Sequence, residues 1–353
     1  MSTFDYDIAI IGLGPAGSNL ARMLPNSYRT IALDKGFCEK SIKKPCGGLL
    51  SEAAQKCLAK LDIHIPSDVL VSPQILSVQV LDINTRRKRR YMRPYINLDR
   101  DKFDRYLISL IPSSVEIRLG AWVSQIKELE EGFMVSYHAD GETRTFTTKY
   151  IVGADGANSF VRRTFFKNHK IRSYVAIQQW FTDTDKPYFS AVYDKKTSDA
   201  CSWSIHKDGY FIYGGAFKPN DCRRQFEIQK LRAAQRLCMP LESPIKTEAC
   251  MVLRPKSPAE VCLGASSGVF LIGEAAGYIS PSSFEGISFA LDSSRVLAEA
   301  FLDKSDSLSI FKYYKAHTSH LRFKIFLRLL RCPFMFRQFL RSLVLMSGFT
   351  SIE

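Results

Sequence analysis

The sequence of 353 residues lacks the patterns that define several classes of protein. Its nine cysteines form no C-x-x-C pair and no histidine-spaced zinc pattern. An odd number of scattered cysteines is typical of reduced thiols, so we expect a cytoplasmic protein with no disulfide framework, metal site or iron–sulfur cluster. The sequence also has no RNP motif, zinc finger or recognisable helix-turn-helix, so we expect no nucleic-acid partner.

Long apolar runs are also missing. No charge-free stretch approaches the roughly 18 apolar residues that a membrane-spanning helix needs. The N-terminal residues lack the basic segment and the small-residue cleavage site of a signal peptide, and their apolar stretch leads directly into a glycine loop, so we expect them to belong to the fold. Hydrophobic residues make up 46% of the chain and charged residues 24%, a balance typical of globular proteins, and the length predicts two interleaved domains.

Three separated glycine motifs are the most informative pattern that is present. They are GLGPAG at 12–17, GADG at 153–156 and IGEAAG at 272–277. Each follows an apolar, β-rich run, so each is expected to form a loop at the carboxyl end of a strand in one sheet. Because ligands of such sheets bind at the carboxyl ends of the strands, an extended cofactor is expected to lie across these three loops.

The first loop has the spacing of a dinucleotide-binding turn. Gly12 permits the tight turn, Gly14 lets the backbone approach a pyrophosphate, and Gly17 lets the helix expected at 15–24 pack against the strand. An acid at the end of the next apolar run, Asp34, suits a ribose diol and would repel a 2′-phosphate. The residues predicted to bind the cofactor here are Gly12, Gly14, Pro15, Ala16, Gly17, Asp34 and Lys35.

The net charge of +14 favours an anionic partner, and two stretches concentrate it. One is the basic run at 86–90, which lies between two strand-like segments, 75–83 and 91–96, and is expected to form the loop of a hairpin. This run is interpreted either as a solvated loop or as part of a basic surface that docks an anionic partner.

The other basic stretch is the C-terminus, where large apolar residues alternate with cations at helical spacing from 321 to 346. Pro333 is expected to divide this stretch into two helices. Helices of this composition can lie in a lipid interface with their arginines reaching the phosphates. They can equally pack onto the body of the protein, and the sequence leaves both interpretations open.

Chain order predicts an α/β fold in which a Rossmann-type cofactor-binding domain is interleaved with a second domain. The second domain has alternating patterns typical of strands, and it is expected to form an antiparallel sheet that supplies a substrate pocket between the domains. The first domain is assigned to 1–69, 98–169 and 266–310, the second to 70–97 and 170–265, and the C-terminal amphipathic helices to 311–353.

Longer segments carry a resemblance to a known family. They are GLGPAG, KPCGGLL at 44–50, DRDKFDRYL at 99–107, VGADGANSFVR at 152–162, VAIQQWF at 175–181, SWSIHKDGYFIYGGA at 202–216 and FLIGEAAGYISPSSFEGISFALDS at 270–293. The chain resembles flavoproteins of the geranylgeranyl reductase family, within the wider group of p-hydroxybenzoate hydroxylase-like enzymes, and it is most similar to the CbrA-type proteins. The resemblance runs nearly from end to end.

This resemblance implies that the cofactor is FAD, with GADGANSFVR supplying pyrophosphate and ribityl contacts and IGEAAG lying near the ribityl chain. It also implies that Arg100 lies along the flavin dinucleotide and that Gly286 shapes the start of a helix beside the isoalloxazine. Glu274 stands where the family usually has Asp. The further cofactor residues that the resemblance implies are Arg100, Asp155, Gly156, Gly273, Glu274, Gly286 and Ile287.

The KPCGG segment is predicted to form the catalytic loop with Cys46, Gly47 and Gly48. Its two glycines would let the backbone pass close to a flat ring. The thiol of Cys46 is expected to donate a proton, to hold a water molecule or to line the pocket.

The substrate side of the site is predicted from SWSIHK at 202–207, which resembles the family's Tyr-x-Trp-x-Phe-Pro-Lys motif at Trp203 and Lys207. Cys, Ile and His stand where Tyr, Phe and Pro are usual. An aromatic wall and a lysine would suit an apolar chain that ends in phosphate. Gln178, Gln179 and Trp180 are candidates for the same cavity, but alternate residues of a strand point to opposite faces, so not all of them can line it. The predicted substrate residues are Gln179, Trp203 and Lys207.

The predicted activity is that of an FAD-dependent oxidoreductase that reduces carbon–carbon double bonds of an isoprenoid or other lipid. Only one dinucleotide-binding unit is visible, so the electron donor is expected to be NAD(P)H that binds transiently or a ferredoxin-like carrier. The alternatives are an FAD-dependent monooxygenase and a membrane-associated flavoprotein without lipid-reductase activity, and a halogenase is disfavoured because the G-x-W-x-W-x-I-P signature is missing. The expected partners are a lipid-like small molecule and the inner face of the membrane, and a monomer is favoured.

Overall fold

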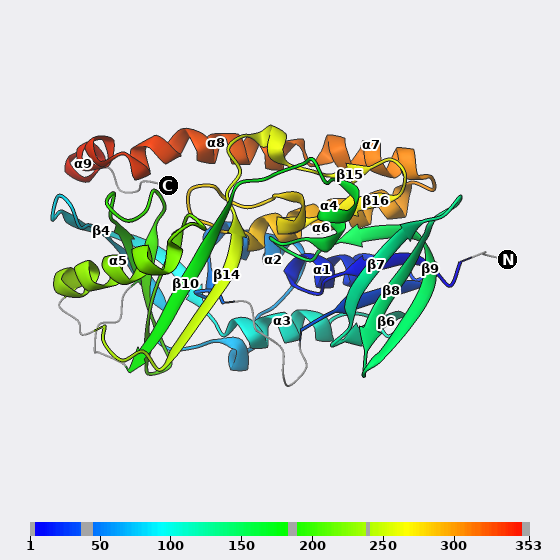
Figure 1. Cartoon of the computed structure of the whole chain (residues 1–353), viewed down its shortest axis with the longest axis horizontal. Coiled ribbons are helices and arrows are strands. Elements are labelled where there is room, and N and C mark those ends of the chain that lie inside the picture. The colour runs from blue at the N-terminus through cyan, green and yellow to red at the C-terminus, as the bar shows by residue number, and fades with distance from the viewer. Residues whose placement is uncertain (1–3, 37–44, 183–188, 238–240, 348–353) are drawn as a thin grey trace.

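The computed structural model describes residues 4–36, 45–182, 189–237 and 241–347. Within these ranges the chain forms two eight-stranded sheets that lie next to each other along the long axis, and its C-terminal helices run along one long edge (Figure 1). The predicted α/β fold with a helical C-terminus is therefore confirmed.

The first sheet is built around the parallel strands that precede the glycine loops. Its strands are β1 (Tyr6–Ile11), β2 (Thr30–Asp34), β6 (Val115–Leu119), β7 (Trp122–Glu128), β8 (Phe133–Ala139), β9 (Glu142–Gly153), β15 (Gly264–Ala265) and β16 (Val269–Leu271). The order is β15-β16-β9-β1-β2-β6, with β7 and β8 attached to β9. Ile11 of β1 and Leu271 of β16 both pair with Gly153 of β9, so these strands end at one level and their loops meet, as predicted.

The second sheet is almost entirely antiparallel. Its strands are β3 (Leu49–Leu50), β4 (Ile75–Asp82), β5 (Lys88–Asn97), β10 (Ser173–Thr182), β11 (Phe189–Tyr193), β12 (Ser202–Lys207), β13 (Tyr210–Phe217) and β14 (Lys246–Leu253). The order is β14-β10-β13-β12-β11-β4-β5-β3, and β11 pairs with β4 in parallel. Two short strands do not follow the domain bounds expected from the sequence. Strand β3 lies within 1–69, expected in the first domain, but pairs in the second sheet, and β15 lies within 170–265, expected in the second domain, but pairs in the first sheet.

The hairpin expected around the basic run is confirmed, but its loop is shorter than predicted. Lys88, Arg89 and Arg90 lie within β5, where Lys88 pairs with Leu81 of β4, and only the first two arginines of the run remain in the turn. An antiparallel strand with one solvated face can carry charged side chains, so a run of charge does not by itself end a strand.

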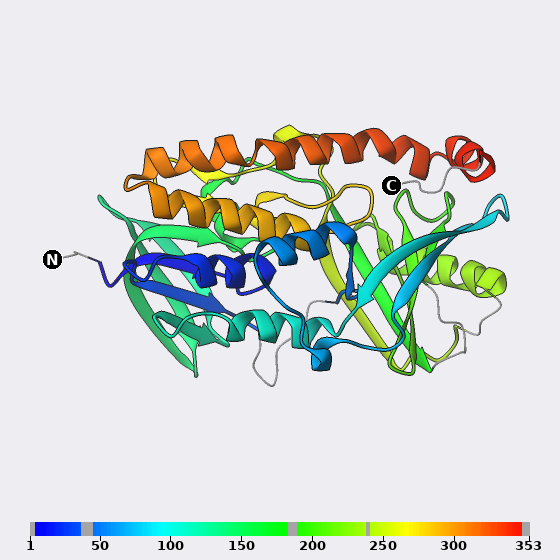
Figure 2. The ribbon, with the colours of Figure 1, turned by 180° about the vertical axis from the view of Figure 1, so that it is seen from behind.

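Nine helices occur in the described part of the chain, besides three short 3-10 turns. They are α1 (Pro15–Met23), α2 (Glu52–Lys60), α3 (Arg100–Ser109), α4 (Phe160–Phe165), α5 (Cys222–Leu237), α6 (Ile287–Asp303), α7 (Ser307–His317), α8 (Ser319–Phe336) and α9 (Gln338–Met346). Helices α1 and α6 pack with the first sheet, and α5 covers one face of the second sheet through Phe226 and Ala233. Figure 2 shows α7, α8 and α9 along one outer edge.

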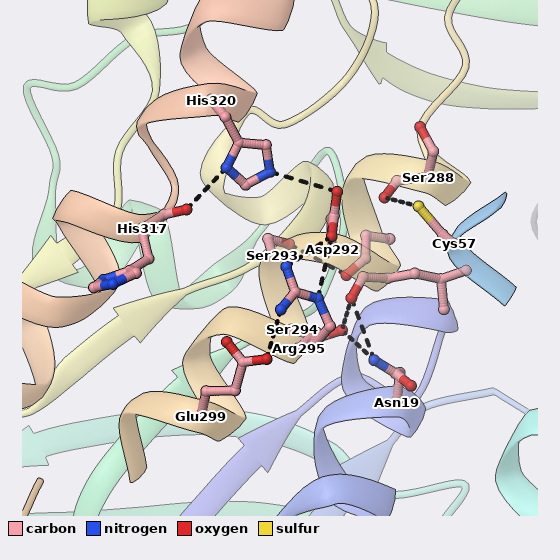
Figure 3. Close-up of polar contacts among 12 residues, drawn as sticks. Asn19, Cys57, Ser288, Asp292, Ser293, Ser294, Arg295, Glu299, His317 and His320 are labelled. Carbon is pink, nitrogen blue, oxygen red and sulfur yellow. Dashed lines mark hydrogen bonds and ion pairs between the residues drawn. The ribbon is translucent and has the colours of Figure 1, made fainter. Parts of the chain in front are cut away.

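Polar contacts join α6 to α1 and to α8 (Figure 3). Asn19 of α1 donates through Nδ2 to Ser294 Oγ at 2.9 Å and to the Leu291 carbonyl at 3.3 Å. Asp292 of α6 lies 3.5 Å from His320 Nε2 of α8. Since α1 follows the first glycine loop and α6 follows the third, the hydrogen bonds of Asn19 keep the two loops in a fixed relation.

Pro333 does not divide the C-terminal stretch, contrary to the prediction. Helix α8 continues through Pro333 to Phe336, and the break falls at Arg337, whose backbone is extended with φ −83° and ψ 118°. A proline removes the hydrogen bond to the carbonyl four residues earlier. Helix α8 tolerates the loss of this bond at Pro333 and ends only where the chain turns into α9.

Candidate functional site

The first glycine loop and the GADG loop lie against each other where β1 and β9 end. Gly12 has φ 103°, and a Cβ atom there would lie 2.6 Å from the Ala154 carbonyl oxygen. A Cβ atom at Gly17 would overlap the Gly12 carbonyl oxygen. Side chains at either position would push the loops or the helix apart, so the protein's own packing requires both glycines.

Asp34 stabilises the first loop through hydrogen bonds to backbone amides. Its Oδ2 accepts a hydrogen bond from Leu13 N at 2.6 Å, and its Oδ1 accepts one from Gly36 N at 2.6 Å. The neighbouring Lys35 is exposed. An ionised carboxylate has further lone pairs besides these two, so Asp34 can position the loop and still accept a hydrogen bond from a diol.

Gly14 and Gly156 differ from the packing glycines. Among the described residues, no atom lies within 4 Å of a Cβ atom built at either position. Gly14 is the N-cap of α1, no side chain caps this helix, Pro15 starts it, and its first turn has no acid. An uncapped helix N-terminus beside two open glycines fits a pyrophosphate, since the amides of Ala16 and its neighbours and the helix dipole both favour an anion.

Asp155 of the GADG loop is buried and only half satisfied. Its Oδ2 accepts from Phe160 N at 2.6 Å and from Val161 N at 3.2 Å. Its Oδ1 is buried without a hydrogen-bond partner in the part of the chain that the structure describes. Burial raises the pKa of this carboxyl, against the hydrogen bonds from Ser159 and the backbone. A buried acceptor without a donor fits a hydroxyl of a bound cofactor such as FAD.

The third glycine loop connects the two sheets. Gly273 N donates to Ser293 Oγ of α6 at 2.9 Å, and Glu274 Oε1 accepts from Leu253 N of β14 at 2.9 Å. The longer side chain of Glu274, where the family pattern has Asp, therefore reaches the backbone of the second sheet. Gly286 is the N-cap of α6, before Ile287.

The KPCGG loop packs on strand β12, and its first residue lies outside the described residues. A Cβ atom at Gly47 would lie 2.6 Å from Ile205 Cδ1, and one at Gly48 would overlap Lys207 Nζ. Lys207 Nζ donates to the Gly47 carbonyl at 2.9 Å and to the Leu98 carbonyl at 2.6 Å. The packing on β12 therefore accounts for both glycines, and Lys207 lies beneath the loop, where burial lowers its pKa to about 8.

Cys46 in this loop faces two cations. Burial disfavours its thiolate, but the positive charges of Arg100 and Lys207 and a hydrogen bond from Gly48 N, at 3.4 Å, outweigh burial and lower its pKa. Arg100 Nε donates to Asp104 Oδ1 at 2.7 Å, and this pair is largely buried. Arg100, predicted to lie along the cofactor, thus stands at the start of α3 between a carboxylate and the thiol.

The predicted substrate residues do not share one face of the second sheet. Trp203 and Gln178 each pair with Gly214, and a Cβ atom at Gly214 would lie 2.6 Å from Trp203 Nε1. Gln179 points to the opposite face, where its Oε1 accepts from Lys230 Nζ of α5 at 2.9 Å. Successive strand residues point to opposite faces, so the structure places Gln178 on the Trp203 side and Gln179 against α5.

Gln178 was a candidate for this cavity together with Gln179 and Trp180, but it was not among the predicted substrate residues. Its Oε1 and the Nε1 of Trp203 are buried, and neither has a hydrogen-bond partner within the described ranges. One is an acceptor and the other a donor, and they flank Gly214 on one face of the sheet. The alternation of β10 separates Gln178 from Gln179, but it could not show which of them faces α5.

Arg254 is a residue of the site that the sequence did not single out. It is buried just after β14, where its Nε donates to the Pro281 carbonyl at 2.9 Å and its Nη1 to Tyr174 Oη at 3.1 Å. It therefore ties the loop before α6 to the second sheet. No motif in the sequence marks this position.

Residues 113–303, more than half of the chain, match the family described as the FAD binding domain. The chain belongs to this family of FAD-binding oxidoreductases and monooxygenases. FAD is thus its cofactor, and the open glycines and the half-satisfied Asp155 fit that cofactor. Protein CbrA of Shigella flexneri is 43% identical over 98% of this chain and 94% of its own length. Protein CbrA of Escherichia coli K12 is 42% identical over 98% of both chains, which confirms the resemblance to CbrA-type proteins.

Solved structures with the same fold include several kinds of flavoprotein. A geranylgeranyl bacteriochlorophyll reductase-like protein from Thermoplasma acidophilum has a TM-score of 0.83 at 19% identity, over 99% of this chain and 93% of its own. A probable FAD-dependent monooxygenase from Pseudomonas aeruginosa, PqsL, has a TM-score of 0.68 at 15% identity, over 96% and 99%. At these identities the likeness shows the fold. None of the described helices is long and apolar enough to cross a bilayer.

Proposed function

We propose that the protein reduces carbon–carbon double bonds of an isoprenoid or other lipid-like molecule with FAD as its cofactor. The observation that carries this proposal is the thiol of Cys46, which faces Arg100 and Lys207 in a loop packed on the second sheet. Reducing a double bond takes a proton as well as a hydride. A thiol with a lowered pKa is a more efficient proton donor near neutral pH than an ordinary thiol. The fold of the reductase-like protein from Thermoplasma acidophilum supports the same reaction class.

The residues that would hold FAD come from the first two glycine loops. The open backbone at Gly14 and Gly156 and the N-terminus of α1 would receive the pyrophosphate, and Asp155 Oδ1 would accept from a hydroxyl. When bound, FAD supplies hydride chemistry with electrons from an external donor. We propose NAD(P)H or a ferredoxin-like carrier as that donor, since the sequence shows one glycine-rich turn of the dinucleotide type.

The chain's own residues would handle the proton and the substrate. Lys207 fixes the loop by holding the Gly47 carbonyl, and Arg100 stabilises the Cys46 thiolate once the proton has left. Solvent then returns the proton to the thiolate. Trp203 Nε1 and Gln178 Oε1 would bind a polar group of the substrate, because together they offer one donor and one acceptor.

Anaerobic turnover tests this proposal. The purified protein, loaded with FAD and supplied with NADPH or reduced ferredoxin, is incubated with polyprenyl phosphates, and mass spectrometry follows the lipid. We expect products that carry two additional hydrogen atoms for each reduced bond. The Cys46→Ser variant should keep its flavin and lose about 10²- to 10⁴-fold in rate. Cys222→Ser, at the start of α5, is the matched control and should keep the rate.

Two results would contradict the reductase proposal. Oxygen-dependent insertion of one oxygen atom into the lipid, with NADPH consumed, would assign the protein to the monooxygenases. PqsL, a probable FAD-dependent monooxygenase, has the same fold as this chain. A flavin-loaded protein that turns over no lipid with either donor would favour a flavoprotein without lipid-reductase activity.

A further inference from the structure

Helices α8 and α9 carry an apolar face that no described residue covers. Its side chains, which we call the α8–α9 apolar face, are Phe323, Phe326, Leu327, Leu330 and Phe334 of α8 and Phe339, Leu343 and Met346 of α9. Each is between 40% and 72% exposed. Within each helix, steps of three or four residues connect the members, which places them on one side. Exposed apolar side chains gathered in this way on two consecutive helices mark an interaction site.

The opposite face of the same helices is packed, so their orientation is fixed. Leu321 and Ile325 of α8 belong to the core of the first sheet. Met335 and Leu345 pack on the second sheet with Tyr193. The helices therefore cannot turn their exposed side chains inward without losing contacts to both sheets.

A buried ion pair adds to this anchoring. Arg341 of α9 is 1% exposed, and its Nη2 lies 2.6 Å from Asp82 Oδ2 of β4. Its Nε donates to the same oxygen at 2.8 Å, and its guanidinium lies 4.8 Å from the centre of the Tyr193 ring. This arginine, one of the cations of the C-terminal stretch, points inward and pins α9 to the second sheet.

Charge of one sign accompanies the apolar face. The segment 307–347 contains eight Lys and Arg residues and no Asp or Glu, so it contributes +8 of the net charge of +14. Lys312, Lys315 and Arg337 are exposed, and Arg331 is half-buried. Arg331 lies four residues after Leu327 and Arg337 three residues after Phe334, so cations border the apolar face, and the segment has no acid of its own.

The basic hairpin extends this charge to α9. Arg87 Nη1 donates to the Ser342 carbonyl, and Arg89 Nη1 donates to the Leu345 carbonyl, both at 3.2 Å. The arginines of the β4–β5 hairpin thus lie at the end of the apolar face. The basic run and the C-terminal helices, far apart in the sequence, adjoin in the structure.

We propose that the α8–α9 apolar face inserts into the interface of an anionic phospholipid bilayer, with the helices lying in its plane. Phenylalanine and leucine would enter the acyl boundary, and the flanking cations would meet lipid phosphates. The helices lie along an outer edge of the molecule in both views, where a flat surface can reach them (Figures 1 and 2). A second copy of this chain fits less well, because it would bring one positive surface against another.

Vesicle sedimentation tests the proposal on the full chain loaded with FAD. We expect binding to phosphatidylcholine vesicles that contain about one-third phosphatidylglycerol, and weaker binding both to phosphatidylcholine alone and at high salt. The double variant Phe326→Gln/Leu330→Gln should bind the anionic vesicles at least roughly tenfold more weakly. Ile228→Gln/Leu231→Gln, which removes two exposed apolar side chains from α5, is the matched control and should bind like the wild type.

Further measurements separate lipid binding from other roles of this face. Arg331→Gln/Arg337→Gln should weaken binding to anionic vesicles and leave binding to neutral vesicles unchanged. Every variant is checked for the flavin content and thermal midpoint of the wild type, which the surface positions should preserve. Equal vesicle binding by the α8 variant and the wild type would overturn the proposal. So would wild-type dimers in sedimentation velocity that the α8 variant abolishes, since the occupant would then be a second copy.

Discussion

Replacing Gly14 tests the placement of the cofactor more directly than any other single change. The Cβ atom of Gly14→Val would meet no described atom within 4 Å, and φ −67° is accessible to every residue. The new side chain lowers the entropy of the unfolded chain, which stabilises the protein by about 0.4–1 kcal/mol, whereas the loss of glycine from the N-cap costs a similar amount. We therefore expect the free energy of unfolding of the flavin-free protein to change by less than about 1 kcal/mol.

The same substitution should strongly weaken FAD binding. The isopropyl group would occupy the space through which the backbone approaches a pyrophosphate. A loss of at least about 100-fold in affinity, or about 2.7 kcal/mol, is expected from titration of the flavin-free protein with FAD. Gly17→Ala is the contrasting variant, because its Cβ atom would overlap the Gly12 carbonyl oxygen and destabilise the flavin-free protein itself by about 1–3 kcal/mol.

The assay combines two measurements on each variant. Flavin absorbance after desalting and a binding titration give the affinity. Thermal unfolding of the flavin-free protein gives the stability, because bound FAD would stabilise the wild type and hide the comparison. Stoichiometric flavin in purified Gly14→Val would refute the placement of the pyrophosphate at this loop. A flavin-free Gly14→Val that unfolds as readily as Gly17→Ala would refute the description of Gly14 as an open, ligand-facing position.

Three further predictions concern charged groups in and around the site. Arg100→Gln should raise the pKa of Cys46, so the pH midpoint of its alkylation by iodoacetamide should move upward, and an unchanged midpoint would separate Arg100 from the thiol. Burial lowers the pKa of Lys207 from 10.5 to about 8, so the folded protein binds fewer protons than the unfolded chain between pH 8 and pH 10.5. The free energy of unfolding, measured by denaturant titration and compared with that of Lys207→Met, should therefore rise with pH over this range. A difference in unfolding free energy that does not change with pH would mean that the amine of Lys207 is solvated. Arg341→Met leaves Asp82 buried without its partner and should cost about 3–5 kcal/mol in urea unfolding, whereas a loss below about 1 kcal/mol would show that water reaches the carboxylate.

The cofactor loops were predictable from short patterns because their requirements are local. Gly12 and Gly17 are needed where a strand turns sharply into a helix that packs against it, and this geometry imposes a fixed spacing. The apolar runs before each motif predicted parallel strands, whose carboxyl ends meet at one edge of a sheet. The convergence of three loops that lie far apart in the chain followed from these local requirements.

Other features were misplaced because the local pattern fits two structures equally. A proline beyond the first turn can either end a helix or be carried within it at the loss of one hydrogen bond, so Pro333 alone could not locate the break at Arg337. A run of cations suits a turn and the solvated side of a strand, and pairing with Leu81 of β4 decided that Lys88 belongs to β5.

The sequence by itself determined the fold class, the cofactor loops and the concentration of positive charge at the C-terminus, because glycine spacing, strand periodicity and charge are properties of short segments. Only the tertiary structure decided which of Gln178 and Gln179 lies beside Trp203, and that Lys207 supports the Cys46 loop from below. Alternation along a strand separates two faces, but only the packing of α5 and of the loop on the finished sheet decides which face each element covers.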